Sequence, residues 1–366
     1  MRHDRRPAGL RRTAAAVIAD LYPGYFALVM ATGIVSIALR QQGLEAAARA
    51  MLGLNIAAWV ALWLVTLVRI ARYPERVWAD VLDPQRSAGF LTAIAGTSVL
   101  GRQLVLMTDD LALPFALWTV SAALWLVLLY GFFASIMLRE EQHPVDRALH
   151  GGWLLAVVAT QAVSLLGVRV VDRAGGGREM LLLGMLALFL LGCLLYLFIG
   201  GAIFFRLLFI RPVAAALTPL YWIAMGAAAI TVVAGATLVE SAPQWRILPL
   251  ILPFLTGSTL LFWAAATWWI PLLVLLGVWR HGVRRYPVVY EPQYWGMVFP
   301  LGMYAVATYE LATMLEMPAL ADISRGATVV ALLAWATVFA AMARRVWGRF
   351  AGAPGPLRGN TRVEDA

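Results

Sequence analysis

The chain has 366 residues, of which 62% are hydrophobic and 13% charged, and its mean hydropathy is +0.78. A soluble domain is far less apolar, so composition alone predicts an integral membrane protein. We attribute the net charge of +9 to topology and to contact with anionic lipid headgroups, which argues against nucleic-acid binding. The single cysteine, Cys193, lies in an apolar run, which excludes disulfides and clustered thiolate metal sites.

All 29 basic residues are arginine, and their distribution predicts the orientation of the protein. With a cytoplasmic N-terminus, 21 arginines fall in the two tails and the cytoplasmic loops, and 7 fall in the loops on the other side. Arginine-rich segments favour the cytoplasm, so we expect both termini there, with the protein in the inner (plasma) membrane of a bacterium. Residues 1–22 are then a basic cytoplasmic tail, 23–343 one transmembrane domain, and 344–366 a cytoplasmic C-terminal tail.

Ten apolar runs are each long enough to cross the ~30 Å hydrocarbon core of a bilayer. They predict an all-α integral membrane protein whose ten transmembrane helices are joined by short loops. The odd-numbered runs recur every 63 to 74 residues, which predicts five successive helical hairpins. The predicted spans are 23–40, 49–71, 88–108, 113–138, 151–170, 180–205, 219–239, 247–278, 293–315 and 326–343.

The two helices of each predicted hairpin differ in composition. Even-numbered runs are richer in leucine and tryptophan, which is typical of surfaces that face lipid. Odd-numbered runs are richer in glycine, serine and threonine, which allow close backbone approach and polar contacts between helices. We therefore expect the odd helices to surround a central pore and the even helices to enclose them.

A stripe of small and hydroxylated residues recurs on single faces of the odd helices. Such a stripe provides donors that meet an anion without fully neutralising it, and its recurrence in several hairpins favours pore lining. The alternative is that the same small residues only pack one helix against another. The predicted pore-lining residues are Thr32, Ser36, Thr92, Gly96, Gln103, Thr160, Ser164, Thr231 and Gly235.

The ninth run combines glycine and proline near a phenylalanine. Gly296, Pro300 and Gly302 fall within seven residues, and such a cluster predicts a helix kink. A carbonyl freed by the kink is tolerated only beside protein or water, so we place the kink in the interior or beside a cavity. Phe299 lies at this kink.

Three stretches resemble one known family: YPGYFALVMATGIVSIAL at 22–39, GGWLLAVVATQAVSLLG at 151–167 and YWGMVFPLGMYAVATYELA at 294–312. The chain resembles the tellurite-resistance and dicarboxylate transporter family, which includes yeast malate permeases, fungal sulfite pumps and plant slow anion channels. The resemblance implies ten helices around one pore per subunit, a homotrimer, and a pore-blocking phenylalanine that matches Phe299. The first stretch is more similar to the permease branch of the family than to the channel branch.

Two charged residues in the predicted spans remain open to more than one interpretation. Arg102 either reaches the outer interface, pairs with an acid, or attracts anions at the mouth of the pore. Glu310 lies on the same helix face as Phe299, about 16 Å further along. Together with Glu240 it is either an interfacial acid, solvated or paired with Arg102 or Arg169, or a proton acceptor in symport.

The sequence predicts a transport protein for small inorganic anions or dicarboxylates such as malate, with a proton-coupled dicarboxylate, sulfite or tellurite carrier as the alternative. The histidines are scattered over tails and loops, so we expect no metal or cofactor. No nucleotide-binding motif is present, and solute gradients are the expected energy source. Asp109 and Asp110 lack a second acidic motif, which leaves a membrane-embedded enzyme such as a prenyltransferase a remote alternative.

Overall fold

A computed structural model describes residues 15–139, 144–245 and 248–350. This part of the chain is helical and contains no strand, and nine of its helices are long and apolar enough to cross a bilayer. The protein is therefore an all-α integral membrane protein, as composition predicted. The remaining long helix, α12 (Trp295–Met314), has 20 residues but is less apolar because it includes Tyr304, Tyr309 and Glu310.

The long helices divide into two classes by burial, in the predicted alternation. In four helices of the first class, 78 to 94% of the most apolar stretch is buried, against 11 to 39% in the second class. Most residues of α12 are also buried, so lipid does not reach this less apolar helix. The inner helices are α2 (Ala27–Gln41), α5 (Leu91–Met107), α8 (Leu155–Val170), α10 (Ile223–Ser241) and α12. The outer helices are α3 (Glu45–Arg72), α6 (Ala112–Met137), α9 (Arg178–Phe209), α11 (Leu248–Val278) and α13 (Pro318–Phe350).

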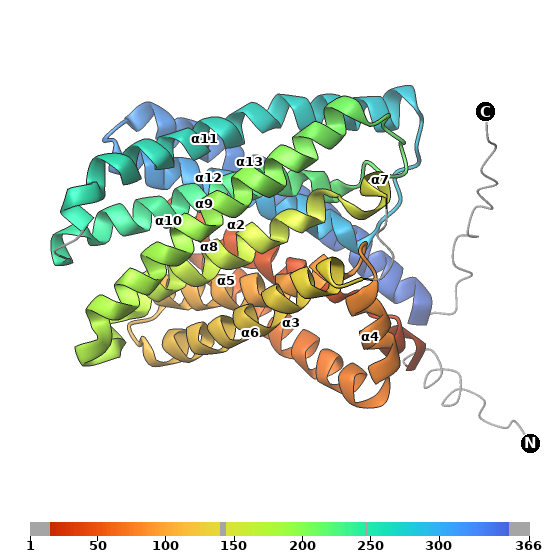
Figure 1. Cartoon of the computed structure of the whole chain (residues 1–366), viewed down its shortest axis with the longest axis horizontal. Helices are drawn as coiled ribbons and strands as arrows, with labels where there is room; N and C mark the ends of the chain where they lie inside the picture. The colour runs from red at the N-terminus through yellow and green to blue at the C-terminus, as the bar shows by residue number, and fades with distance from the viewer. Residues whose placement is uncertain (1–14, 140–143, 246–247, 351–366) are drawn as a thin grey trace, which may run out of the picture.

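The five inner helices form a closed ring. Each packs against the next along the chain, and α12 packs against α2 to close the circle. Each outer helix follows an inner one as the second arm of a hairpin and also touches the inner helix of the next hairpin, with α13 returning to α2. We call the end where the inner helices begin the N-side, and the end where they finish the far side. Figure 1 shows the long helices running side by side, with the short helices α4 (Pro74–Leu82) and α7 (Val145–Ala148) together at the N-side.

The residues at which the two predicted tails meet the transmembrane domain differ from those in the structure. Residues 1–14 and 351–366 lie outside the described residues, but 344–350 continue α13 without a break. The predicted span 326–343 is therefore only the apolar part of a longer helix, because arginines favour helix as strongly as leucine does and do not end it. At the other end, residues 19–22 contact the bundle through bonds described below.

The outer helices are tied to the inner ring by a repeated hydrogen bond. In four of the five hairpins, a tryptophan indole of the outer helix donates to a threonine hydroxyl on the inner helix of the next hairpin, at 2.9 to 3.1 Å. The exception is α9, which contains no tryptophan, so Thr231 of α10 has no such donor. The four pairs are Trp59–Thr97, Trp125–Thr160, Trp263–Thr308 and Trp335–Thr32.

We expect the Trp125–Thr160 hydrogen bond to stabilise the contact between α6 and α8 measurably. Hydrogen bonds between membrane helices contribute roughly 0.6 to 2 kcal/mol. A double-mutant cycle with Trp125→Phe and Thr160→Val, followed by thermal unfolding in detergent, should give a coupling energy in this range. Strictly additive effects of the two substitutions would contradict the assignment.

Candidate functional site

A short 3₁₀ turn precedes each inner helix at the N-side. Three of the five turns have proline in their first two positions, where its fixed φ suits a helix start and its missing N–H leaves no donor unpaired. The turns contact one another in the same circular order as the helices they precede. They are η1 (Pro23–Phe26), η2 (Ser87–Phe90), η3 (Gly151–Leu154), η5 (Pro219–Trp222) and η8 (Pro292–Tyr294).

Glycine allows these turns to approach each other closely. A Cβ on Gly89 of η2 would lie 2.8 Å from the backbone nitrogen of Gly24 in η1. A Cβ on Gly151 of η3 would lie 2.4 Å from the carbonyl oxygen of Leu220 in η5. In both cases the obstacle is backbone, which cannot rotate away, so a side chain at either position forces the ring of turns apart.

A small cavity lies inside the ring just above these turns, lined by residues from all five hairpins. We call it the axial cavity. Its free volume is about 10 Å³, no more than a single water molecule needs. The Phe299 side chain is only 1% exposed and forms part of the wall. The wall also includes Met30 of α2, Thr92 of α5, Leu155 of α8 and Ile223 of α10, so the centre of the ring is closed at this level.

The Gly/Pro cluster of α12 serves close packing around Phe299. α12 runs from Trp295 to Met314 with Pro300 inside the helix, and Gly296 and Pro300 lie in its first two turns. The kink stays a prediction. A Cβ on Gly226 of α10 would lie 2.7 Å from Cγ of Pro300. A Cβ on Gly302 would lie 2.7 Å from Cγ2 of Ile34 in α2. The helix that carries Phe299 is therefore in close contact on both sides.

Most of the predicted pore-lining stripe points to the outer helices, which differs from the expectation. Ser36 donates to the carbonyl of Ala48 in α3, and Ser164 donates to the carbonyl of Met185 in α9, both at 2.7 Å. Gln103 accepts a bond from the buried Asn55 side chain of α3 at 2.9 Å. Together with Thr32 and Thr160, whose tryptophan partners are given above, these residues join inner helices to outer ones.

Of the other residues in the stripe, some pack against neighbouring helices and one lines the axial cavity. A Cβ on Gly235 would lie 2.2 Å from Oγ1 of Thr259 in α11, and one on Gly96 would lie 3.2 Å from the carbonyl oxygen of Phe26. Thr231 donates only to the carbonyl of Ala227 in its own helix. Thr92 is the member of the stripe that lines the axial cavity beside Phe299. It donates to the carbonyl of Gly89 at 2.6 Å.

Polar and charged side chains gather at the far side, one from each inner helix. We call them the far-side polar ring. Arg102 and Glu310 form an ion pair at 2.6 Å, and Gln41 also donates to Glu310 at 3.0 Å. Arg169 and Glu240 form a two-bond ion pair at 2.6 and 3.1 Å. Of the alternatives for Arg102 and Glu310, the structure contains the ion pair.

The Arg102–Glu310 ion pair joins α5 to α12, which pack against opposite sides of α2 in the ring. The Arg102 side chain is 3% exposed and that of Glu310 is 18% exposed. Only Nη2 of Arg102 is bonded in the pair, and its Nε and Nη1 are buried without a partner among the described residues. A buried guanidinium with two unpartnered nitrogens is able to bind a further acceptor, and an anion supplies one.

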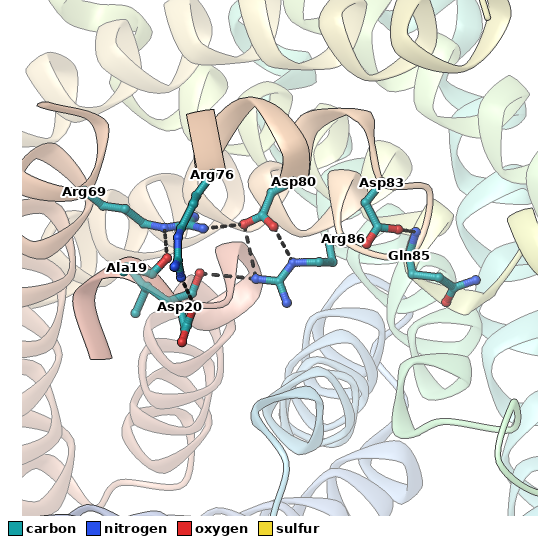
Figure 2. A network of polar contacts seen from close by, with 9 residues as sticks. Ala19, Asp20, Arg69, Arg76, Asp80, Asp83, Gln85 and Arg86 are labelled. Carbon is teal, nitrogen blue, oxygen red and sulfur yellow. Dashed lines mark hydrogen bonds and ion pairs between the residues drawn. The ribbon is translucent and has the colours of Figure 1, made fainter. Parts of the chain in front are cut away.

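A second cluster of charges lies at the N-side, around the buried carboxylate of Asp80 in α4. Figure 2 shows this carboxylate between the guanidinium groups of Arg69 and Arg86. Arg69 donates to it at 2.7 Å and Arg86 at 2.5 Å. Arg69 also donates to the carbonyl of Ala19 at 3.1 Å, and Arg76 pairs with Asp20. The cluster therefore holds α4 against the residues that lead into η1.

This cluster places one arginine at the N-side of the axis. The Arg86 guanidinium lies 5.5 Å from the centre of the Tyr22 ring, and Tyr22 lines the axial cavity. Burial raises the pKa of Tyr22 to about 12, so its hydroxyl stays neutral at physiological pH. Neither residue was among the predicted site residues, because Tyr22 stands alone at the start of a helix and a charged loop residue such as Arg86 gives no periodic signal.

The comparison with known families decides the assignment. The family SLAC1, described as voltage-dependent anion channel, matches residues 20–343, which covers all ten long helices except the last turns of α13. The chain belongs to the SLAC1 family. The recognition made from the three sequence stretches is thereby confirmed.

Several individual proteins are similar to this SLAC1-family chain. An uncharacterized membrane protein of Mycobacterium tuberculosis is 42% identical over 153 residues, 40% of this chain and 75% of the relative. An uncharacterized transporter of Methanocaldococcus jannaschii is 23% identical over 298 residues, 80% of this chain and 85% of the relative. A sulfite efflux pump of Arthroderma otae is 27% identical over 173 residues, 44% of this chain and 46% of the pump. These names point to membrane transport of anions and not to an enzyme.

Within the described residues of this SLAC1-family chain, no group of three or more His, Cys, Asp or Glu side chains is arranged to hold a metal ion. One histidine instead joins the start of η3 to the loop that precedes η2. Nε2 of His150 lies 3.0 Å from the carbonyl of Pro84, and its Nδ1 accepts a bond from the backbone N–H of Gly152 at 3.1 Å. Burial lowers the pKa of His150 to about 4.

The depressed pKa of His150 makes the ring of turns sensitive to acid. The unfolded chain has a histidine pKa near 6.5, so it binds more protons than the folded protein as the pH falls toward 4. We expect acidification from pH 7.5 to 5 to cost roughly 2 kcal/mol of stability through this group. In thermal unfolding in detergent, His150→Asn should lose less stability over this range than wild type, whereas His281→Asn should match wild type. Equal pH dependence of the two variants would count against the assignment.

Proposed function

We propose that this SLAC1-family chain conducts anions through its own centre, along the axis enclosed by the five inner helices, with Phe299 as the gate. The observation that carries the proposal is the axial cavity, because all five hairpins contribute to its wall and Phe299 helps to close it. A closed ring of helices with one aromatic ring at its centre is the arrangement expected of a gated path in the closed state. The family match supports anion transport as the activity.

The charges at the two ends of the axis are suited to anions. Arg86 lies beside the cavity at the N-side, and Arg102 carries two unpartnered nitrogens, Nε and Nη1, at the far side. Positive potential at both mouths raises the local anion concentration and the rate of capture. No acidic side chain is among the described residues that line the axial cavity, where Tyr22, Thr92 and Gln293 are the polar members.

The donors along this path accept several classes of anion. Small inorganic anions and dicarboxylates such as malate remain the proposed substrates, and the match to a sulfite efflux pump adds sulfite as a candidate. Backbone and hydroxyl donors do not distinguish strongly among these anions, so selectivity depends on size and on the cost of desolvation at Phe299.

The arginine asymmetry supports placing the N-side at the cytoplasm. Both termini are then cytoplasmic, in the inner membrane of a bacterium, with 23–343 as the single transport domain. The family resemblance supports a homotrimer with one path in each subunit. In this orientation Arg86 faces the cytoplasm and the Arg102–Glu310 pair faces the outside.

We expect Phe299→Ala to raise anion flux by at least tenfold, because it removes an aromatic ring from a path that holds no more than about one water molecule. Chloride or malate flux into proteoliposomes under a fixed membrane potential measures the effect. Phe189→Ala is the matched control, since Phe189 is a fully buried phenylalanine of α9, away from the axial cavity. Correctly inserted Phe299→Ala protein with wild-type flux would refute the gate.

A proton-coupled carrier is the second candidate function, and the far-side polar ring is the observation that favours it. Glu310 is held by Arg102 and Gln41 at the outer end of the proposed path. Protonation of this carboxylate would release Arg102 and relieve repulsion of an incoming anion. A carrier of this kind moves protons in proportion to substrate, whereas a channel follows the electrochemical gradient of the anion alone.

Replacing Glu310 distinguishes a proton-coupled carrier from a channel. If Glu310 carries protons, Glu310→Gln should raise anion flux at high external pH, flatten its pH dependence and abolish the accompanying proton uptake. Malate or chloride uptake with a pH-sensitive dye inside the proteoliposomes, measured from external pH 5.5 to 8, tests this expectation. Glu240→Gln is the control, because Glu240 forms the more exposed ion pair of the same ring. Superimposable pH profiles for wild type and Glu310→Gln would exclude the carrier.

A further inference from the structure

An apolar groove opens on the side of the bundle at the N-side, between the end of α11 and the start of α12. We call it the lateral groove. Its volume is about 490 Å³, and its wall includes Leu273, Leu276 and Gly277 of α11, Trp222 at the end of η5 and Met297 of α12. Val274 and Val278 at its rim are 47% and 58% exposed, which places the opening on the lipid-facing surface of an outer helix. The groove is separate from the axial cavity.

One arginine closes the N-side end of this groove. Arg280 follows α11 in a π-helical turn, Trp279–Val283, a widened geometry that is frequent at functional sites. The residue is only 5% exposed, yet its Nε is buried without a hydrogen-bond partner. Its guanidinium lies 4.5 Å from the centre of the Tyr286 ring, which fixes its position. A buried cation with an unused donor in the wall of an apolar groove is able to bind a further acceptor there, and an anionic group supplies the strongest one.

Two further arginines follow Arg280 closely along the chain. Arg284 and Arg285 follow it within five residues, and Arg284 lies 5.2 Å from the centre of the Trp279 ring. Among the described residues, no carboxylate forms an ion pair with any of these three arginines. From the sequence, these arginines contributed only to the general charge asymmetry of the chain. Clusters of basic residues at the end of a membrane helix, beside a pocket between helices, are typical of sites for anionic lipid headgroups.

We propose that the lateral groove binds one anionic phospholipid, with an acyl chain against Leu273, Leu276 and Gly277 and the headgroup phosphate on Arg280. A soluble anion such as inorganic phosphate leaves the apolar wall empty, whereas a phospholipid matches both parts of the site. Charge complementarity therefore selects an anionic lipid over a zwitterionic one.

The position of the groove connects this lipid to the inner ring. Tyr294 and Met297 line the groove on one side of η8 and α12, while Gln293, Gly296 and Phe299 line the axial cavity on the other. A bound lipid therefore contacts the segment that carries Phe299. This link to the gate rests on the proposed function, but lipid binding itself does not and is measured separately.

Native mass spectrometry of the purified protein, titrated with phosphatidylglycerol or phosphatidylcholine, tests the site. We expect Arg280→Gln to weaken binding of the first phosphatidylglycerol about fivefold and to leave phosphatidylcholine binding unchanged. Arg139→Gln is the matched control, because Arg139 follows α6, another outer helix, at the same end of the bundle. Equal loss in both variants, or no loss in Arg280→Gln, would overturn the site.

A second pair of variants tests the apolar wall. A Cβ on Gly277 meets no atom within 4 Å, so Gly277→Leu fills the groove without strain and should weaken phosphatidylglycerol binding. Gly257, also in α11 and equally open, provides the control variant Gly257→Leu, which should bind as wild type does. Unchanged binding by Gly277→Leu would overturn the proposal. Displacement of the lipid by inorganic phosphate at equal concentration would also overturn it, in favour of a site for a soluble anion.

Discussion

Polar side chains inside the membrane must find their partners within the protein, because lipid tails offer no hydrogen bonds. In this chain the constraint is met mainly between the inner and outer helices. Four indole N–H groups reach threonines, and two serines reach outer-helix carbonyls. The hydroxyl-rich faces of the inner helices are consequently turned outward, and the centre of the ring near Phe299 is left mainly to apolar side chains.

The same constraint explains which parts of the architecture were predictable. Hydropathy and the spacing of apolar runs predicted the helices, and the contrast in leucine and glycine content predicted which of them are buried. The direction of the polar stripe was not predictable in the same way. A helix face that carries Thr32 or Thr160 shows the same 3.6-residue spacing in the sequence whether it faces the pore axis or packs against an outer helix. The informative signal lay in the partner helices, where tryptophans recur at the hairpin spacing at Trp59 and Trp125.

The charged residues could be predicted only in part for a different reason. The sequence placed Arg102 and Glu310 near one end of their helices and offered their ion pair as one alternative. It could not select that alternative, because the pair joins positions 208 residues apart and a single sequence does not record which distant residues are in contact. Asp80 and Arg86 were harder still, since they lie on a short helix and in a loop whose position depends on packing against Ala19 and Asp20. The charged groups at the two ends of the axis are thus positioned by tertiary contacts, whereas the helices themselves follow from local sequence patterns.

Close packing around α12 restricts how a gate at Phe299 opens. Gly226 contacts Pro300 on one side, Gly302 contacts Ile34 on the other, and a Cβ on Gly296 would lie 2.8 Å from Cδ2 of Leu220. Moving the whole helix would break all three contacts at once, and packed interiors resist such gradual deformation. Rotation of the Phe299 ring leaves the backbone in place but needs room that the axial cavity lacks. Met30 in the cavity wall is unbranched and adaptable, so it can change conformer as the ring moves. If Phe299 is the gate, as we propose, we expect it to open by coupled rearrangement of these two side chains within a fixed ring of helices.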